Sequence, residues 1–275
     1  YLTQNPSRLK EIARLADQMS PGGSDLAESL YKKFAAAHRD DDADALILAE
    51  YYVRTNQPEK AIEHCVADNP PASPERISQA CIQAFDLCRP APSPAILSRV
   101  DGWLSQALAR SPGAYELQLH LALLRTLQGR EEDAVVIYRK VLSSHPDDLF
   151  TLNNLSWMLA LKFAKGEEAL ALIDRAIAHS SPSPSLLDTR AVALISLGRG
   201  GEAVQELKKA LRLDADPSTR QSLYFHMAQA LLIENDQPAA RGAFRDALQA
   251  GLSAESLPAL ERPQFHQLHG ELMSN

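Results

Sequence analysis

Three clusters of residues have types and spacings that could support chemistry. In the first, Asp40, Asp42 and Asp44 alternate as the ligands of a calcium-binding loop do. Such a loop needs Gly at its sixth position and Glu at its twelfth, where this chain has Ala45 and Tyr51. We therefore expect these aspartates to cap a solvent-exposed helix, because Asp side chains accept hydrogen bonds from the first backbone N–H groups of a helix.

The other two clusters lack the residues that their chemistry requires. Gly198, Gly200 and Gly201 have the density of a phosphate-binding loop, but no strand is predicted before them and no Gly-Lys-Ser/Thr follows. They are expected to form a turn between helices. His266 and His269 have a spacing that metal sites use, but no further ligand is evident near them. With no nucleophile–base motif elsewhere, we expect no metal, no cofactor, no catalytic residue and no enzyme activity.

The three cysteines, Cys65, Cys81 and Cys88, follow no disulfide or metal pattern. Their number is odd and no CxxC motif occurs, so we expect buried free thiols. Free thiols favour a reducing compartment such as the cytoplasm. The first twenty residues contain no apolar signal region, and the chain starts with Tyr1 rather than Met, which is compatible with a piece of a longer polypeptide.

The composition indicates a folded helical protein. Hydrophobic residues make up 45% of the chain, charged residues 23% and aromatic residues only 6%, while the abundant Ala and Leu favour helix. The net charge of −7, without a run of Lys and Arg, argues against nucleic acid as a partner. The longest uncharged apolar segment, residues 149–161, contains Asn153 and Asn154 and is too short for a bilayer, so no membrane insertion is expected.

The elements that must position any site recur along the chain. Pairs of small residues twelve positions apart are Ala49 and Ala61, Ala122 and Ala134, Ala191 and Ala203, and Ala228 and Ala240; Ser156 and Ala169 fit with one insertion. Four residues after the second member stand Cys65, Tyr138, Ile173, Leu207 and Phe244. Five residues before it stand Asn56, Gly129, Gly198 and Asn235, types that tolerate the left-handed conformation that ends a helix. Each unit is therefore predicted to be two antiparallel helices that stack on their neighbours.

This pattern resembles the tetratricopeptide repeat, a helix–turn–helix unit of about 34 residues. Leu121, Ala122, Ala134, Tyr138 and Pro146 match its motif. The resemblance implies an all-α fold, a right-handed superhelical solenoid of about seven antiparallel helix pairs with a C-terminal capping helix.

The predicted segments belong to one continuous solenoid domain. Residues 1–41 form a degenerate helix pair, 42–114 two degenerate units, 115–252 four clearer units, and 253–275 the cap. In the cap, an apolar side should cover the last repeat with Leu257, Leu260, Phe265 and Leu268. A polar side should face water with Glu255, Glu261 and Glu271.

The resemblance also implies a binding surface, because in this family the first helix of each pair lines a concave face where peptides lie. That face is expected to carry His120, Asn153, Asn154, Trp157, Asp188, Thr189, Phe225, His226 and Gln229. Trp157 either anchors a partner or packs between units. Asn154 can hydrogen-bond a peptide backbone, but the equivalent positions hold other residue types, so no ladder of amides is expected.

Two further features of this surface depart from the family. Lysine is absent from these positions, so the carboxylate grip of the chaperone-binding members is not expected. Arg190 stands where the family has Leu, and we expect it to pair with Asp188 or a neighbouring acid.

The sequence favours a non-catalytic scaffold that binds a protein or peptide on this face, because stacked helices form extended concave surfaces. Two alternatives stay open. One is an accessory or recruiting arm of a larger multidomain enzyme or assembly, and the other is a self-association module that forms a homo-oligomer. Fold alone does not choose among them.

Overall fold

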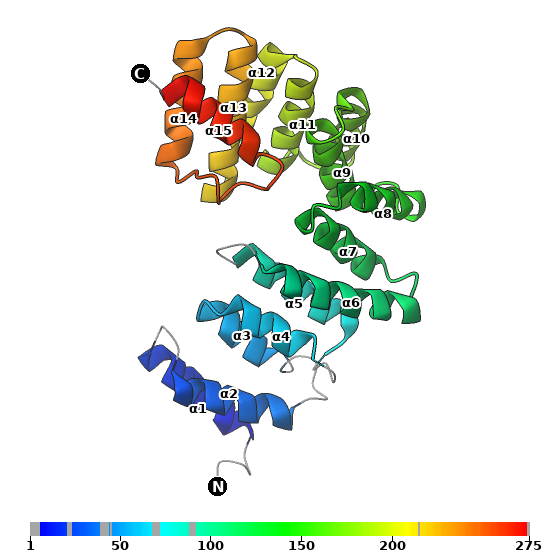
Figure 1. Cartoon of the computed structure of the whole chain (residues 1–275), viewed down its shortest axis with the longest axis vertical. Coiled ribbons are helices and arrows are strands. Elements are labelled where there is room, and N and C mark those ends of the chain that lie inside the picture. The colour runs from blue at the N-terminus through cyan, green and yellow to red at the C-terminus, as the bar shows by residue number, and fades with distance from the viewer. Residues whose placement is uncertain are drawn as a thin grey trace. The chain divides into compact units, whose positions relative to one another are not determined.

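The computed structural model describes residues 6–20, 24–38, 44, 46–67, 72–87, 92–213 and 215–273. Every regular element in these residues is a helix, fifteen in all, and none of them is a strand (Figure 1). The predicted all-α fold is confirmed. Asp40, Asp42 and Cys88 lie outside the described residues.

The chain forms two compact units, residues 1–130 and 131–275. The described part of unit 1 contains α1 (Pro6–Met19), α2 (Asp25–Ala37), α3 (Ile47–Arg54), α4 (Pro58–Cys65), α5 (Pro74–Leu87), α6 (Pro94–Arg110) and α7 (Tyr115–Leu127). Unit 2 contains α8 (Glu131–Ser144), α9 (Leu149–Leu161), α10 (Gly166–Ala178), α11 (Pro184–Ser196), α12 (Gly200–Leu211), α13 (Pro217–Ile233), α14 (Gln237–Gln249) and α15 (Arg262–Met273). The boundary falls between α7 and α8, so the continuity of the array at that point stays a prediction.

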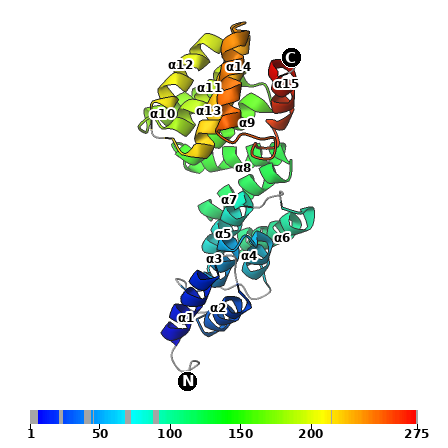
Figure 2. The ribbon, with the colours of Figure 1, turned by 90° about the vertical axis from the view of Figure 1, so that its left-hand side faces the viewer.

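Within each unit, helices pack on the next helix and on the helix two places along the chain. In unit 1, α3 packs on α4 and α5, and α7 packs on α5 and α6. In unit 2, α9 packs on α10 and α11, and α11 packs on α12 and α13. Figures 1 and 2 show the row of helices from α11 to α14 in unit 2. Six of the predicted pairs lie within one unit, namely α1–α2, α3–α4 and α5–α6 in unit 1 and α9–α10, α11–α12 and α13–α14 in unit 2. The pairing of α7 with α8 stays a prediction, and α15 follows α14 in the chain.

The paired small residues are buried, and those whose two helices belong to one unit lie where these helices pack. Those with at most 3% exposure include Ala49, Ala61, Ala122, Ala134, Ala169, Ala191, Ala203, Ala228 and Ala240. Ser156 is the polar member of the set, and its Oγ donates a hydrogen bond of 2.7 Å to the carbonyl oxygen of Ala169. Its hydroxyl is therefore satisfied inside the core, as buried polar groups require.

Left-handed residues form the turn inside the repeats, as predicted. Asn56, Gly129, Gly198 and Asn235 have φ between 58° and 71°. Ala164 has φ of 51° at the same place, five residues before the repeat alanine Ala169. A residue with a Cβ atom costs roughly 1–2 kcal/mol in this conformation, so this copy of the turn is strained.

A cap covers the end of unit 2. Its buried apolar side chains are Leu257, Phe265, Leu268 and Leu272, and Leu252 directly before it is buried as well. The ring of Phe265 lies 5.7 Å from that of Phe244, centroid to centroid. Glu255 and Glu271 are exposed as predicted, but the prediction for Glu261 is wrong, because this side chain is only 2% exposed and is bonded inside the protein.

Candidate binding surfaces

The open face of α9 carries no charge. This helix contains no Asp, Glu, Lys or Arg. One side of it is buried, and the other carries Phe150, Asn153, Asn154 and Trp157 at the spacing of a single helix face. Phe150 is 42% exposed and the other three are half-buried. These four residues are called the α9 stripe below.

The two amides of the α9 stripe keep hydrogen-bonding capacity for a ligand. Asn154 Nδ2 donates 2.8 Å to the carbonyl oxygen of Phe150, one turn back in the same helix. Asn153 Oδ1 is buried and accepts no hydrogen bond from the described residues.

On α11 and α13 the structure corrects the predicted surface. Thr189, Phe225 and His226 are at most 5% exposed. They lie on the first helices as predicted, but the next helix or the cap covers them, so the prediction that they face a partner is wrong. Asp188 keeps 14% of its side chain exposed, and Gln229 is half-buried.

His226 is the centre of a buried ionic cluster. Its Nδ1 lies 2.6 Å from Asp188 Oδ1 and its Nε2 lies 2.7 Å from Glu261 Oε1. Burial opposes a charge on the ring, but the two carboxylates outweigh it and raise the pKa of His226 to about 10. Catalytic sites also pair His with carboxylates, but this ring is 1% exposed and both its nitrogens are engaged. The cluster therefore joins α11, α13 and the cap.

A serine–histidine contact in unit 1 is structural as well. Ser78 Oγ lies 2.6 Å from His120 Nδ1 and donates a hydrogen bond of 2.8 Å to the carbonyl oxygen of Glu75. Because the single hydroxyl hydrogen goes to Glu75, the imidazole donates to Ser78, and burial lowers the pKa of His120. A nucleophilic serine needs the opposite polarity and access to substrate, whereas Ser78 is fully buried. His120 therefore serves the packing of α5 on α7.

Arg190 lies in a groove of about 550 Å³ between α10 and α12. Its Nε lies 2.7 Å from Asp174 Oδ1 and its Nη1 lies 3.1 Å from Glu206 Oε1. Lys209 Nζ lies 2.8 Å from the same Glu206 oxygen. The predicted pairing of Arg190 with a neighbouring acid is confirmed, and the acids are these two rather than Asp188.

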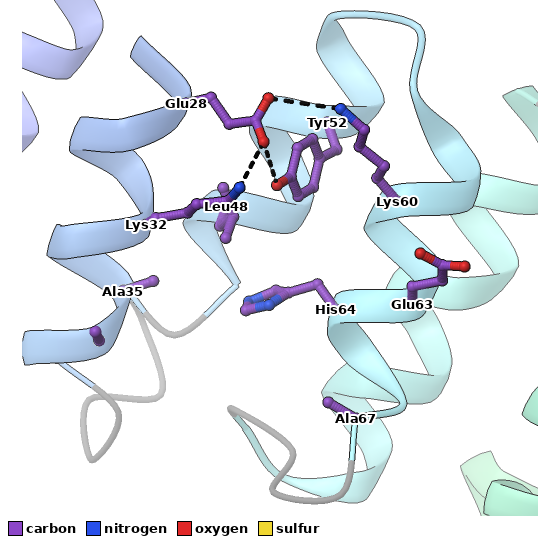
Figure 3. Close-up of a pocket in the computed structure, with 10 residues that line it drawn as sticks. Glu28, Lys32, Ala35, Leu48, Tyr52, Lys60, Glu63, His64 and Ala67 are labelled. Atoms are coloured by element: carbon purple, nitrogen blue, oxygen red, sulfur yellow. Dashed lines mark hydrogen bonds and ion pairs between the residues drawn. The ribbon is translucent and has the colours of Figure 1, made fainter. Parts of the chain in front are cut away.

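Unit 1 has a groove in the corresponding place, between α2 and α4 (Figure 3). Its volume is about 530 Å³. Lys32, Tyr52 and Lys60 surround the carboxylate of Glu28 at one end, and His64 projects into the groove from α4. The sequence did not single out these residues, because the repeat pattern is weakest in this region; their distances from the repeat alanines were the signal that could have found them.

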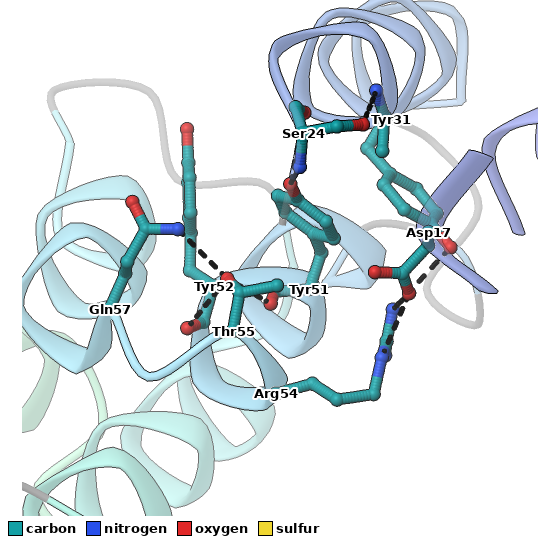
Figure 4. A network of polar contacts seen from close by, with 9 residues as sticks. Asp17, Ser24, Tyr31, Tyr51, Tyr52, Arg54, Thr55 and Gln57 are labelled. Carbon is teal, nitrogen blue, oxygen red and sulfur yellow. Dashed lines mark hydrogen bonds and ion pairs between the residues drawn. The ribbon is translucent and has the colours of Figure 1, made fainter. Parts of the chain in front are cut away.

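Polar contacts hold the first helix pair on α3 (Figure 4). Arg54 Nε donates 3.1 Å to Asp17 Oδ2. The hydroxyl of Tyr51 donates 3.2 Å to the carbonyl oxygen of Ser24 and accepts 3.1 Å from its backbone N–H. Burial raises the pKa of Tyr31, and the nearby charge of Arg54 offsets only part of this rise. These contacts position helices and present no activated nucleophile.

The described residues contain no group of three or more His, Cys, Asp or Glu side chains arranged to hold a metal ion. In the same part of the chain, no helix has the length and apolar character needed to cross a bilayer. Cys65 and Cys81 are buried free thiols, as predicted. A hydrogen bond with Cys65 and burial hold the pKa of Cys81 well above its usual range.

The packing and the periodicity define a helical-repeat protein built from stacked helix pairs. Residues 185–217, which cover α11 and the whole of α12, match the family model of the tetratricopeptide repeat. The resemblance to the tetratricopeptide repeat that the sequence indicates is thereby confirmed for this part of the chain.

Three solved structures share its fold. A tetratricopeptide repeat protein from Parabacteroides merdae aligns over 98% of this chain and 100% of its own, with a TM-score of 0.68 and 13% identity. A chain of the APC/C hetero-tetramer Cut9–Hcn1 aligns over 97% of this chain and 51% of its own, with a TM-score of 0.60 and 13% identity. PilW, a type IV pilus biogenesis factor, aligns over 66% of this chain and 86% of its own, with a TM-score of 0.52 and 21% identity. No curated protein matches the chain.

Proposed function

We propose that this chain is a non-catalytic scaffold that binds an extended segment of a partner protein along the α9 stripe. One observation carries the proposal: α9 has an uncharged, half-open face in a protein of which 23% of the residues are charged. The cores of protein interfaces are depleted in charge and enriched in aromatic residues. Phe150 and Trp157 supply two such rings on this face.

The spacing of the α9 stripe fits a peptide. Phe150 and Trp157 are seven residues apart, which is about 10 Å along a helix, a length that roughly three extended residues span. Asn153 and Asn154 lie between the two rings and can bond a peptide backbone without reading its sequence. Apolar side chains of the partner would then contact the rings. PilW is a type IV pilus biogenesis factor and Cut9–Hcn1 is a hetero-tetramer, so both are examples of this fold used in assembly.

The test is photo-crosslinking from position 150, followed by affinity measurements with the partner that it identifies. We expect Trp157→Ala to weaken binding by roughly 30-fold, the effect of losing an anchor worth about 2 kcal/mol. Phe150→Ser changes a more exposed side chain, so it tests the same face with less risk to folding. Val136→Ser on α8 is the matched control, because Val136 is apolar, 67% exposed and outside the α9 stripe.

Circular dichroism must show that each variant keeps its helices. The proposal is wrong if the folded Trp157 and Phe150 variants bind as tightly as the wild type, or if Val136→Ser weakens binding as much as they do. Crosslinks between two copies of this chain, together with a dimer in light scattering, would make the partner a second copy.

A further inference from the structure

The groove between α2 and α4 in unit 1 contains a ready-made receptor for a carboxylate. Lys32 Nζ lies 2.7 Å from Glu28 Oε1, and the hydroxyl of Tyr52 donates 3.0 Å to the same oxygen. Lys60 Nζ lies 3.6 Å from Glu28 Oε2 and 5.5 Å from the centroid of the Tyr52 ring. Three donors from three helices thus converge on one point (Figure 3).

The two lysines can serve a second acid. Their side chains are 56% and 51% exposed for Lys32 and Lys60, and each ammonium group carries three donors. The hydrogen bond from Lys32 lowers the pKa of Glu28, so this carboxylate is charged and competes for the same donors. Beyond Glu28 the groove continues past Leu48, and its walls there include the small side chains of Ala35 and Ala67. That space suits the short apolar stem of an acidic side chain.

The fold does not dictate the presence of the two lysines, because the corresponding groove in unit 2 has other residues at the same repeat positions. Ala27 stands four residues before Tyr31, as Ala134 stands four residues before Tyr138, and so takes the repeat-alanine position of the first helix pair. Lys32 follows Ala27 by five residues, and Asp174 follows Ala169 by five. In the same way His64 corresponds to Glu206, and Leu48 corresponds to Arg190. The groove in unit 2 therefore has two acids at these positions, which Arg190 and Lys209 neutralise. The groove in unit 1 has Lys32 and His64 there and Leu48 in place of the arginine. Its wall also carries Glu63, which lies 3.8 Å from Arg99 Nη1.

We propose that the groove between α2 and α4 is a second binding site, which takes an acidic side chain of a peptide, with Lys32, Lys60 and Tyr52 holding the carboxylate and Glu28 as an internal competitor. The site is separate from the α9 stripe and does not depend on it. It also differs in position from the peptide surface of the family, because it lies between second helices. Charge complementarity selects the occupant, since the donors already hold one carboxylate.

The test is an NMR titration of the full chain with a blocked peptide of alternating Ala and Glu, beside the same peptide with Gln in place of Glu. We expect the Glu peptide to shift the signals of α2 and α4 and the Gln peptide to leave them unchanged. The double variant Lys32→Gln, Lys60→Gln should weaken binding by about tenfold or more, since hydrogen bonds to charged groups are strong. Glu28→Gln should strengthen binding by about fivefold, because it removes the competitor.

The strengthening by Glu28→Gln distinguishes a receptor from a purely structural ion pair, which would give no gain in affinity. Glu202→Gln is the matched control, because it changes the net charge equally at an exposed position in unit 2. The proposal is overturned if Glu28→Gln leaves the affinity unchanged or lowers it, if Glu202→Gln raises it equally, or if the Gln peptide binds as well as the Glu peptide.

Discussion

Replacing His226 with Gln removes the cation that lies between Asp188 and Glu261. Both acids then stay close together in a region where Glu261 is 2% exposed. Breaking a buried ion pair by removing one partner typically costs about 3–5 kcal/mol. The pKa of His226 leads to a similar value, because a rise from 6.5 to about 10 is equivalent to about 5 kcal/mol. We therefore expect a loss of roughly 3–5 kcal/mol in the free energy of unfolding of unit 2.

The stabilisation by His226 should decrease as the pH rises. The pKa of His226 is higher in the folded than in the unfolded protein, so its stabilising contribution is fully present below pH 6.5. It is lost as the pH rises toward about 10. Between pH 7 and 9 the free energy of unfolding of the wild type should fall by about 2–3 kcal/mol, and that of the His226→Gln variant should not show this fall.

Urea denaturation at several pH values measures both effects, and hydrogen exchange localises them. Each helix pair contacts only its neighbours, so faster exchange should appear in α13 and α15 first. His266→Gln is the control, because His266 is exposed on α15. Equal stability of His226→Gln and wild type, or parallel pH profiles for the two, would refute the reasoning.

Three smaller changes test the turns and helix ends. Ala164→Gly should raise the stability by about 0.5–1 kcal/mol in urea denaturation, because it relieves the left-handed strain but adds freedom to the unfolded chain; a loss would contradict the strain. Gly200→Ala should destabilise the protein by about 1–3 kcal/mol in the same assay, because the added Cβ would lie 2.6 Å from the backbone oxygen of Ala230. Gly242→Ala is the control and should not destabilise the protein, because Gly242 has open space around it. Asp216→Ala should cost about 1 kcal/mol in a thermal melt and increase exchange at the start of α13, because Asp216 caps that helix.

Periodicity accounts for what the sequence predicted well. Buried alanines such as Ala191 and Ala203 must recur wherever two helices approach closely, and the turn before the second helix must be left-handed, so both leave a visible spacing. Ala164 has the same left-handed turn conformation. Its residue type did not indicate this, because alanine disfavours that conformation and the repeat packing imposes it.

The sequence by itself determined the helix pairs, the cap and the absence of a recognisable catalytic motif, because these depend on contacts close along the chain. Only the tertiary structure decided which residues of the first helices stay open. Phe225 and His226 occupy positions like those of the α9 stripe, yet the cap buries them, and Glu261 is buried although its spacing pointed to water. Such burial depends on what packs from the next repeat, as does the pairing of Glu28 with side chains of three helices. The sequence of one repeat does not show which side chains of another repeat will pack against its charged residues.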